Sequence, residues 1–143
     1  MRELKTTIEI AAKPEEVWSI LIDIGQWPDW NPIVNKMEGN LKVGEELSIT
    51  MCDKEGNDGQ SYNATITAID EAKRFSYIGS MMSKFLFAAD RIFELEESGD
   101  RTLFTQREVF TGLMVPLFWK KLNAHAVPMY HAMNEALKAK AEG

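Results

Sequence analysis

Cysteine is almost absent from this chain, since Cys52 is the only one among 143 residues. A single thiol excludes an internal disulfide and a cysteine-based metal cluster, and it is typical of a protein from a reducing compartment. Histidine is also scarce, with two residues, and no HExxH or comparable compact ligand spacing occurs. We therefore expect neither a bound metal nor a cofactor.

Long apolar segments are missing as well. No stretch approaches the roughly 18 residues that a membrane-spanning helix needs. The first ten residues, MRELKTTIEI, alternate charged and apolar side chains and contain no signal-peptide core. We expect a cytoplasmic protein without stable membrane insertion.

Positive charge is in deficit, because 16 basic residues face 22 acidic ones and leave a net charge of −6. An acidic surface repels phosphate backbones, so a nucleic-acid partner is not expected, and anionic membranes are disfavoured for the same reason. Neither a glycine-rich phosphate loop after a strand nor a GxSxG nucleophile elbow is present. Nucleotide binding and serine-hydrolase chemistry therefore have no support.

What remains is ordinary globular composition, with 45% hydrophobic and 27% charged residues. A chain of this length buries enough surface for its own core, so residues 1–143 are expected to form a single domain.

Hydrophobic periodicity changes twice along the chain. Alternation predicts a first strand at Leu4–Ile10, and Pro14 suits the first position of a short helix, with Glu15 and Glu16 in its first turn. The residues IGQWPDWNP then predict a break and a second short helix or turn. Period-two patterning and turn residues predict six further strands at Ile33–Glu38, Glu46–Cys52, Ser61–Ile69, Arg74–Gly79, Phe85–Glu96 and Thr102–Phe110.

A helical period takes over from Pro116 to Ala139, where Pro128 is expected to kink the helix or to break one turn. The order predicts an α+β fold. It consists of a strongly curved antiparallel sheet of about seven strands, two short helices after the first strand, and a long C-terminal helix over the concave face. Such an arrangement leaves space for a small ligand between sheet and helix.

Several motifs resemble the SRPBCC superfamily, in its polyketide cyclase/dehydrase-like branch. They are IAAKPEEVWSIL, QWPDWNP and REVFTGLMVPL, with weaker matches at EGNLKVGEEL and EAKRFSYIG. The resemblance covers essentially the whole chain and implies the helix-grip fold of START-like proteins. It also implies a cavity for lipid-, sterol- or polyketide-like molecules, used for catalysis in a minority of members.

The turn at Gly99-Asp100 fixes a hairpin register, because a two-residue loop with glycine first suits a type II′ turn. Counting back from this turn places Arg91 opposite Glu108, on the same face as Phe93 and Gln106. We expect an Arg91–Glu108 ion pair on the concave face. It either orients a ligand or satisfies itself at the cavity mouth.

Other aromatic and polar side chains are candidates for the cavity. Trp27 either gates the entrance or packs in the core, Tyr77 offers a hydroxyl, and His125 lies on the apolar stripe of the last helix. The apolar segment containing Met81, Met82 and Phe85 suits a core strand, a cavity rim or a subunit contact. The predicted ligand-binding residues are Trp27, Tyr77, Phe87, Arg91, Phe93, Gln106, Glu108, Phe110, His125 and Met129.

Three functions compete. The first is a binding protein for one small, mostly apolar molecule. The second is a polyketide cyclase-like enzyme with Glu108 as catalytic base and Arg91 stabilising an enolate oxygen, although a nearby arginine lowers a carboxylate's pKa. The third is a protein-interaction module of chaperone-activator type, which requires an exposed apolar patch. A homodimer is possible in each case.

Overall fold

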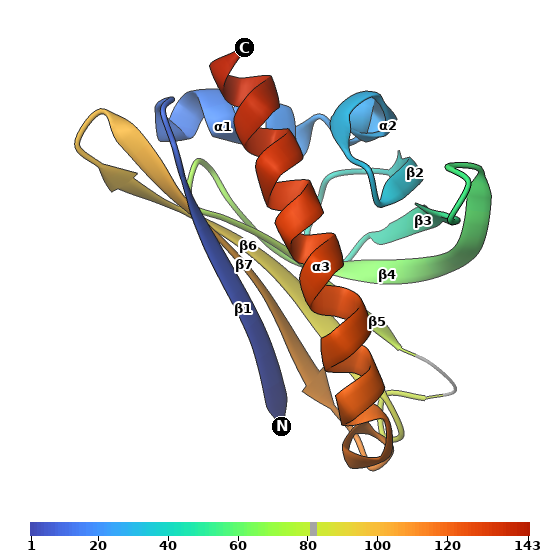
Figure 1. Cartoon of the computed structure of the whole chain (residues 1–143). Helices are drawn as coiled ribbons and strands as arrows, with labels where there is room; N and C mark the ends of the chain where they lie inside the picture. Colours follow the sequence, from blue (N-terminus) through green and yellow to red (C-terminus); the bar gives the residue numbers. More distant parts are fainter. Residues whose placement is uncertain (81–82) are drawn as a thin grey trace.

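The computed structural model describes residues 1–80 and 83–143. Its sheet has seven antiparallel strands in the order β1-β7-β6-β5-β4-β3-β2, and it curls around one long helix, α3, which spans Val115–Glu142 (Figure 1). The fold is therefore α+β with a long C-terminal helix, as expected. The strands are β1 (Arg2–Ile10), β2 (Val34–Gly39), β3 (Glu46–Cys52), β4 (Asp58–Asp70), β5 (Arg74–Ser80), β6 (Ala88–Ser98) and β7 (Arg101–Thr111).

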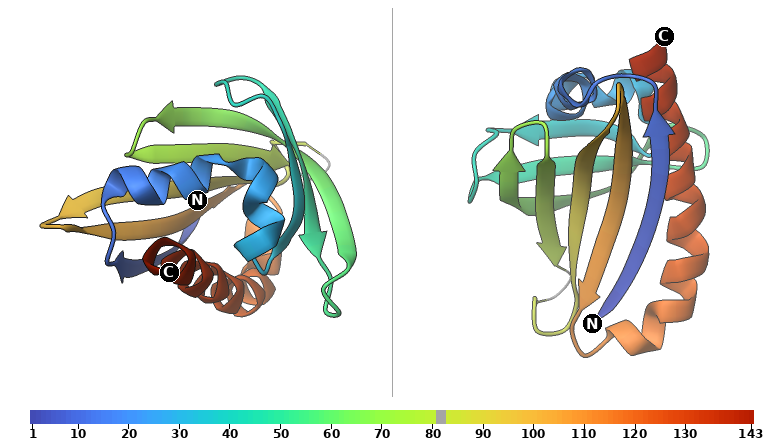
Figure 2. Two further views of the ribbon diagram at one scale, coloured as in Figure 1. Left: turned by 90° about the horizontal axis from the view of Figure 1, so that it is seen from above. Right: turned by 90° about the vertical axis from the view of Figure 1, so that its left-hand side faces the viewer.

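Two short helices follow β1 and close one end of the curled sheet. Helix α1 (Pro14–Ile22) begins at the predicted proline, and α2 (Trp27–Trp30) follows it after a 3-10 turn at Ile24–Gln26. Figure 2 shows both helices lying across the sheet beside the C-terminal end of α3. The sequence prediction of a short helix, a break and a second short helix is confirmed.

The curvature of the sheet has a local cause in its outer strands. The pairing of β3 with β4 shifts register between Thr50 and Cys52, and the pairing of β4 with β5 shifts between Ile66 and Ala68. Such bulges bend a strand and increase its twist. The long strand β4 consequently sweeps around α3 (Figure 1).

Two strands begin three residues away from their predicted starts, and the first is β4, which begins at Asp58 and not at Ser61. We expected a strand from Phe85, but β6 begins at Ala88 because Ser83 starts a turn. The Ser83 carbonyl oxygen accepts hydrogen bonds from the N–H groups of Leu86 and Phe87, at 3.1 and 3.0 Å. Phe85 is consequently a turn residue and not a core residue, while Met81 and Met82 lie outside the described residues.

Helix α3 continues without a break through Pro128, contrary to one of the two expected outcomes. Proline removes the hydrogen bond to the carbonyl four residues earlier, here that of Ala124. Both Pro128 and Ala124 are exposed, so water can hydrate that carbonyl and the helix can continue. No helix within the described part of the chain is long and apolar enough to cross a membrane.

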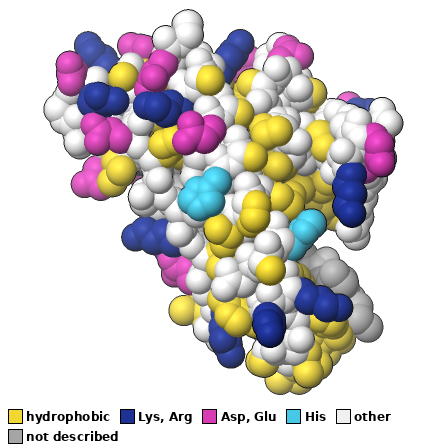
Figure 3. Space-filling view, viewed as in Figure 1, with side chains coloured by type: hydrophobic (Ala, Val, Ile, Leu, Met, Phe, Trp, Pro, Cys, Tyr) yellow, Lys and Arg dark blue, Asp and Glu magenta, His cyan; other side chains and the backbone are white. Residues whose placement is uncertain are grey.

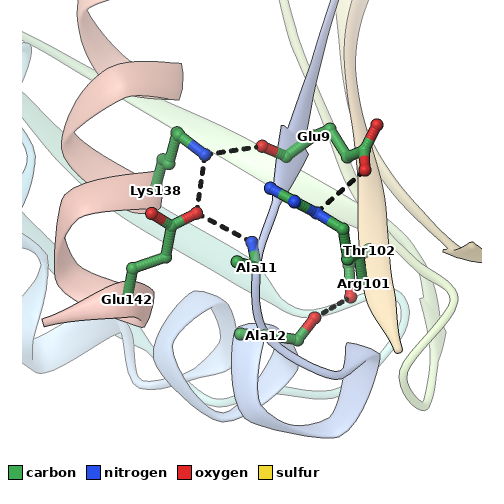
Figure 4. Close-up of polar contacts among 7 residues, drawn as sticks. All are labelled: Glu9, Ala11, Ala12, Arg101, Thr102, Lys138 and Glu142. Carbon is green, nitrogen blue, oxygen red and sulfur yellow. Dashed lines mark hydrogen bonds and ion pairs between the residues drawn. The ribbon is translucent and has the colours of Figure 1, made fainter. Parts of the chain in front are cut away.

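The C-terminal end of α3 is tied to the corner after β1 (Figure 4). The Glu142 carboxylate accepts hydrogen bonds from the Ala11 N–H at 2.7 Å and from the Lys138 ammonium at 2.6 Å. Lys138 also donates to the Glu9 carbonyl oxygen at 2.9 Å. These contacts hold the helix against the sheet at the end where α1 and α2 also pack.

Candidate functional site

A cavity of about 530 Å³ lies between the lower half of α3 and the concave face of the sheet. Figure 3 shows hydrophobic side chains in the hollow between the helix and the curled strands. The volume is within the usual range of ligand sites. The wall residues are Met51, Cys52, Asp53, Gly59, Gln60, Tyr62, Tyr77, Gly79, Ser80, Phe87, Ala89, Arg91, Glu108, Phe110, Leu122, His125, Ala126, Met129 and Tyr130.

Small side chains keep this space open. Gly79 on β5, Ala89 on β6 and Ala126 on α3 all face the cavity, where larger residues would fill it. A Cβ atom on Gly79 would already lie 3.5 Å from the ring of Tyr62, so any longer side chain there would reduce the volume. Small residues on three different elements therefore leave the volume of the cavity unfilled.

The predicted hairpin register is confirmed. Gly99 has a φ of +67°, as the first residue of the two-residue turn requires, and Ser98 pairs with Arg101. The same ladder places Arg91 directly opposite Glu108, and both side chains line the cavity.

The expected Arg91–Glu108 ion pair is not formed. Among the described residues, no carboxylate oxygen lies within 4.0 Å of the Arg91 guanidinium. Arg91 instead donates from Nη2 to Oε1 of Gln106, and its guanidinium carbon lies 4.6 Å from the ring centre of Tyr130. This cation–π contact and the amide hydrogen bond compensate part of the cost of a side chain that is only 7% exposed.

A chain of buried polar side chains holds Arg91 in place. Gln106 donates from Nε2 to the side-chain oxygen of Asn134 at 2.8 Å and to the Tyr130 carbonyl oxygen at 3.3 Å. Asn134 in turn donates to the Thr6 hydroxyl at 2.9 Å. The chain thus links the cavity to α3 and to β1, and it fixes the orientation of the arginine before any ligand arrives.

The buried Tyr130 hydroxyl and Arg91 Nε have no hydrogen-bond partner among the described residues, and neither has the half-buried carboxyl of the wall residue Glu108. Burial raises the pKa of this carboxyl, the positive charge of Arg91 lowers it, and Asp90 raises it further, so that the net direction is upward. Sequence reasoning expected Arg91 to dominate and to weaken Glu108 as a base. Desolvation dominates instead, because the guanidinium is turned toward Gln106.

Two tyrosine hydroxyls complete the polar part of the wall. Tyr62 and Tyr77 are neighbours on β4 and β5, and burial raises the pKa of both phenols, more strongly for Tyr77. Both therefore stay protonated at neutral pH and can donate hydrogen bonds. The wall thus combines the carboxyls of Asp53 and Glu108, the Arg91 guanidinium and three phenols, those of Tyr62, Tyr77 and Tyr130, with mainly apolar surface.

Seven of the ten predicted ligand-binding residues line the cavity. They are Tyr77, Phe87, Arg91, Glu108, Phe110, His125 and Met129.

The other three, Trp27, Phe93 and Gln106, lie outside the cavity wall and are 0% exposed. The Trp27 indole N–H donates to the Leu21 carbonyl oxygen at 2.9 Å, and the ring packs edge-on to Phe93 at 5.8 Å. Trp27 is consequently a core residue and not a gate. Gln106 acts on the cavity only through Arg91.

Several wall residues were missed by sequence reasoning. Ala89 lies two residues before Arg91 on the same face of β6, so strand alternation was sufficient to find it. Leu122, Ala126 and Tyr130 follow each other at intervals of four on α3, along one side of the predicted stripe. Tyr62 was considered as a possible hydroxyl donor together with Tyr77 but was left out of the predicted set, and the structure places it in the wall.

Other candidate sites are weaker. Within the described residues, no three histidine, cysteine, aspartate or glutamate side chains come together as a metal site requires. A wider concavity of about 750 Å³ is lined by charged residues such as Lys5, Glu94 and Glu96. Glu94 and Glu96 point away from the face that carries Phe93 and Leu95, and their charges suit water better than an apolar ligand.

Residues 1–142 match the protein family described as "Polyketide cyclase / dehydrase and lipid transport". The chain belongs to this family. A search of the curated proteins finds no match.

Solved structures with the same fold include aromatase/cyclases and a START superfamily protein. The Zhui aromatase/cyclase from Streptomyces sp. R1128 is 18% identical, with a TM-score of 0.78 over 99% of this chain and 93% of that one. A START superfamily protein from Mycobacterium smegmatis is 21% identical, with a TM-score of 0.71 over 98% and 97%. The di-domain ARO/CYC StfQ, from the steffimycin biosynthetic pathway, is 13% identical with a TM-score of 0.78, and this chain spans 98% of its own length but 50% of StfQ. These likenesses, all below 25% identity, show that the chain shares the fold of these proteins.

Proposed function

We propose that this protein binds one small, mostly apolar molecule that carries a polar group, in the cavity between α3 and the sheet. The observation that carries the proposal is a largely apolar cavity whose wall residues include two buried polar atoms without a hydrogen-bond partner from the described residues, the Tyr130 hydroxyl and Arg91 Nε, beside the unpaired Glu108 carboxyl. Leaving a buried polar group unpaired costs roughly 1–3 kcal/mol. A ligand oxygen that accepts from the Tyr130 hydroxyl would remove that cost, and a ligand hydroxyl that donates to Glu108 would add orientation, while both gain the apolar contact.

The polar groups differ in their expected tasks. Arg91 is held by Gln106 and Tyr130 before binding, so it supplies a fixed positive potential. Tyr62 and Tyr77 supply neutral donors for a carbonyl or hydroxyl oxygen. Affinity would come from the apolar side chains, Phe87, Phe110, Leu122 and Met129 among them, and orientation from the polar set.

Filling the cavity tests the binding site directly. We expect the wild-type protein to bind one molecule of the apolar fluorescent dye 1-anilinonaphthalene-8-sulfonate, and Ala126→Phe to weaken this binding by at least about tenfold. Ala124→Phe is the matched control, because it places the same ring on an exposed position of α3. Equal dye binding by both variants would refute the cavity as the binding site.

Native mass spectrometry of protein purified from cells then identifies the natural occupant. A retained, unmodified small molecule is the expected result. Its affinity should fall about 10- to 100-fold in Glu108→Gln, which loses a charge-assisted hydrogen bond. Glu96→Gln makes the same chemical change at an exposed position of the neighbouring strand β6. This variant should bind the ligand as the wild type does.

A cyclase-like enzyme is the second candidate, and the direction of the Glu108 pKa favours it. A raised pKa brings a carboxyl closer to the operating pH of a general acid or base. Arg91 would then stabilise negative charge on an enolate oxygen. Turnover of a polyketide-like ketone that falls by roughly 10²–10⁴ in Glu108→Gln, while the ketone still binds, would identify catalysis instead of carriage.

A further inference from the structure

Large hydrophobic side chains are exposed together at one end of the molecule. Phe85 is 71% exposed, Leu113 65%, Leu117 78% and Phe118 40%. We call these four residues the apolar tip. They come from the turn before β6 and from the junction of β7 with α3, which form the lower end of the molecule in Figure 1. Figure 3 shows hydrophobic atoms at this end, interspersed with lysine and arginine side chains.

The tip is held in its exposed position by backbone contacts. The N–H groups of Leu113 and Met114 donate to the carbonyl oxygens of Phe85 and Leu86, at 3.2 and 3.0 Å. The close approach depends on Gly112, which has a φ of +119° and whose added Cβ would lie 2.3 Å from the Leu86 oxygen. Backbone hydrogen bonds therefore join the two segments to each other, and the fold itself holds the side chains of the apolar tip in solvent.

The charge around the tip is opposite in sign to that of the whole protein. Lys84, Lys120 and Lys121 are exposed beside it, and the sequence from residue 109 to residue 134 contains no aspartate or glutamate. The stretch from residue 76 to residue 89, which contains Phe85, has none either. In Figure 3 the acidic side chains gather in the upper and middle parts of the visible face. The net charge of −6 is thus unevenly distributed.

We propose that the apolar tip docks on an anionic lipid surface. Leucine and phenylalanine side chains enter the boundary of a bilayer, while neighbouring lysines contact its negative headgroups. Each lysine near such a surface contributes about 1 kcal/mol, and two weak signals together give stable anchoring where one does not. Along α3 the first acidic residue after Lys121 is Glu135, 14 residues or about 21 Å further on, which exceeds the screening length of about 8 Å at physiological ionic strength.

The position of the tip connects docking to the cavity. Phe118 precedes the cavity residue Leu122 by one helical turn, and Phe85 precedes the cavity residue Phe87 by two positions. A docked molecule would therefore hold one wall of its cavity near the bilayer. The docking proposal itself does not depend on what the cavity contains.

A second copy of the chain suits the tip less well. A two-fold contact would bring the same patch of both copies together, including Lys84, Lys120 and Lys121 of each. Like charges without intervening carboxylates oppose such a pair. The chemistry of the patch therefore favours a negatively charged partner over a second copy of itself.

Vesicle co-sedimentation tests the proposal. We expect the wild-type protein to bind phosphatidylcholine vesicles that contain about a third phosphatidylserine, and to bind pure phosphatidylcholine and high-salt samples much more weakly. Lys120→Ala combined with Lys121→Ala should weaken binding roughly 25-fold, since each lost lysine accounts for about a fivefold change. Phe85→Ser combined with Leu117→Ser should weaken it as well. Val43→Ser is the matched control, because Val43 is 55% exposed between β2 and β3, away from the tip.

Two results would overturn the proposal. The first is the absence of wild-type binding to the phosphatidylserine vesicles at low salt, or equal binding by the tip variants. The second is a dimer or a co-purifying protein that disappears in the tip variants while vesicles remain unbound, which would assign the tip to a protein partner. Dye binding in the cavity should be unchanged in every tip variant, so failure of docking is distinguishable from failure of the proposed cavity function.

Discussion

The two ends of the space between α3 and the sheet are built from the same elements but packed in opposite ways. At the packed end, where α1 and α2 lie, the rings of Trp27, Phe75, Phe93 and Phe104 contact one another and are fully buried. At the open end, small residues and polar groups leave about 530 Å³ unfilled. The space between the sheet and α3 thus has one end whose packing stabilises the fold and one end that is open to a ligand.

The boundary between the two halves is the buried polar chain. Arg91 faces the cavity on one side and contacts the ring of Phe93 on the other, at 5.6 Å. Gln106 and Asn134 lie behind it in the core. The comparison teaches that stability and binding are separable in this molecule, because substitutions on either side of that chain should affect different measurements.

The largest expected effect contrasts one phenylalanine from each half. Phe93→Ala should lower the free energy of unfolding by about 3–5 kcal/mol, because it opens a cavity in a filled core. Phe87→Ala should cost less than about half as much, since Phe87 is half-buried beside space that is already empty. Urea unfolding of both variants provides the measurement. Equal losses would mean that the two ends are packed alike.

An intermediate effect is expected at the boundary. Gln106→Leu removes the hydrogen-bond partner of Arg91 and of Asn134 and should lower the free energy of unfolding by roughly 2–4 kcal/mol. Asn134→Leu alone should cost less, because Arg91 keeps its amide partner.

The double variant completes a mutant cycle between these two residues. Because they share one hydrogen bond, the double variant should lose less than the sum of the two single losses. Additive losses would show that the chain does not act as one unit.

The smallest expected effect is a pair of opposite pH dependences. The folded-state pKa of Glu108 is raised above 4.5, so its ionisation opposes folding as the pH rises through that raised value. Glu108→Gln should therefore gain stability relative to the wild type as the pH increases. The pKa of Glu142 is lowered by its hydrogen bonds, so its contribution is present above 4.5 and is lost as the pH falls through the lowered value.

Glu142→Gln should accordingly be less stable than the wild type at neutral pH, and the difference should vanish in acid. Melting temperatures measured from about pH 3 to about pH 8 provide the comparison. The two glutamine variants carry the same chemical change, so each is the control for the other. Slopes of the same sign would contradict the assignment of Glu108 to an apolar cavity and of Glu142 to a hydrogen-bonded corner.

Much of the fold and part of the site could be predicted from local patterns. The turn at Gly99-Asp100 determines the pairing of Arg91 with Glu108, because the side-chain period of a strand is two and a short turn allows one register. The proline at residue 14 and the alternation of β7 were equally informative. The same patterns placed four apolar or aromatic residues in the cavity wall, because the apolar strand faces and the helix stripe point toward it. These residues are Phe87, Phe110, His125 and Met129.

Apart from the local turn at Ser83 that delays the start of β6, the errors arose where contacts between distant elements compete. Trp27 was expected near the entrance, but a deeper position beside Phe93 buries its whole ring and satisfies its N–H. Phe118 lies inside the helix predicted at Pro116–Ala139, yet its side chain remains 40% exposed in the first turns of α3. Glu108 was expected to pair with Arg91, but Gln106 lies closer to the guanidinium.

The sequence by itself determined the order of the elements, the hairpin register and which face of each strand is apolar, because these depend on neighbours along the chain and on periods of two and 3.6 residues. Only the tertiary structure decided where the concave face is filled and where it stays empty. It also decided which partner the arginine takes and that Phe85 and Leu113 meet at one exposed end. Those outcomes depend on the curvature of the sheet and on distances between side chains far apart in the sequence, which local patterns do not contain.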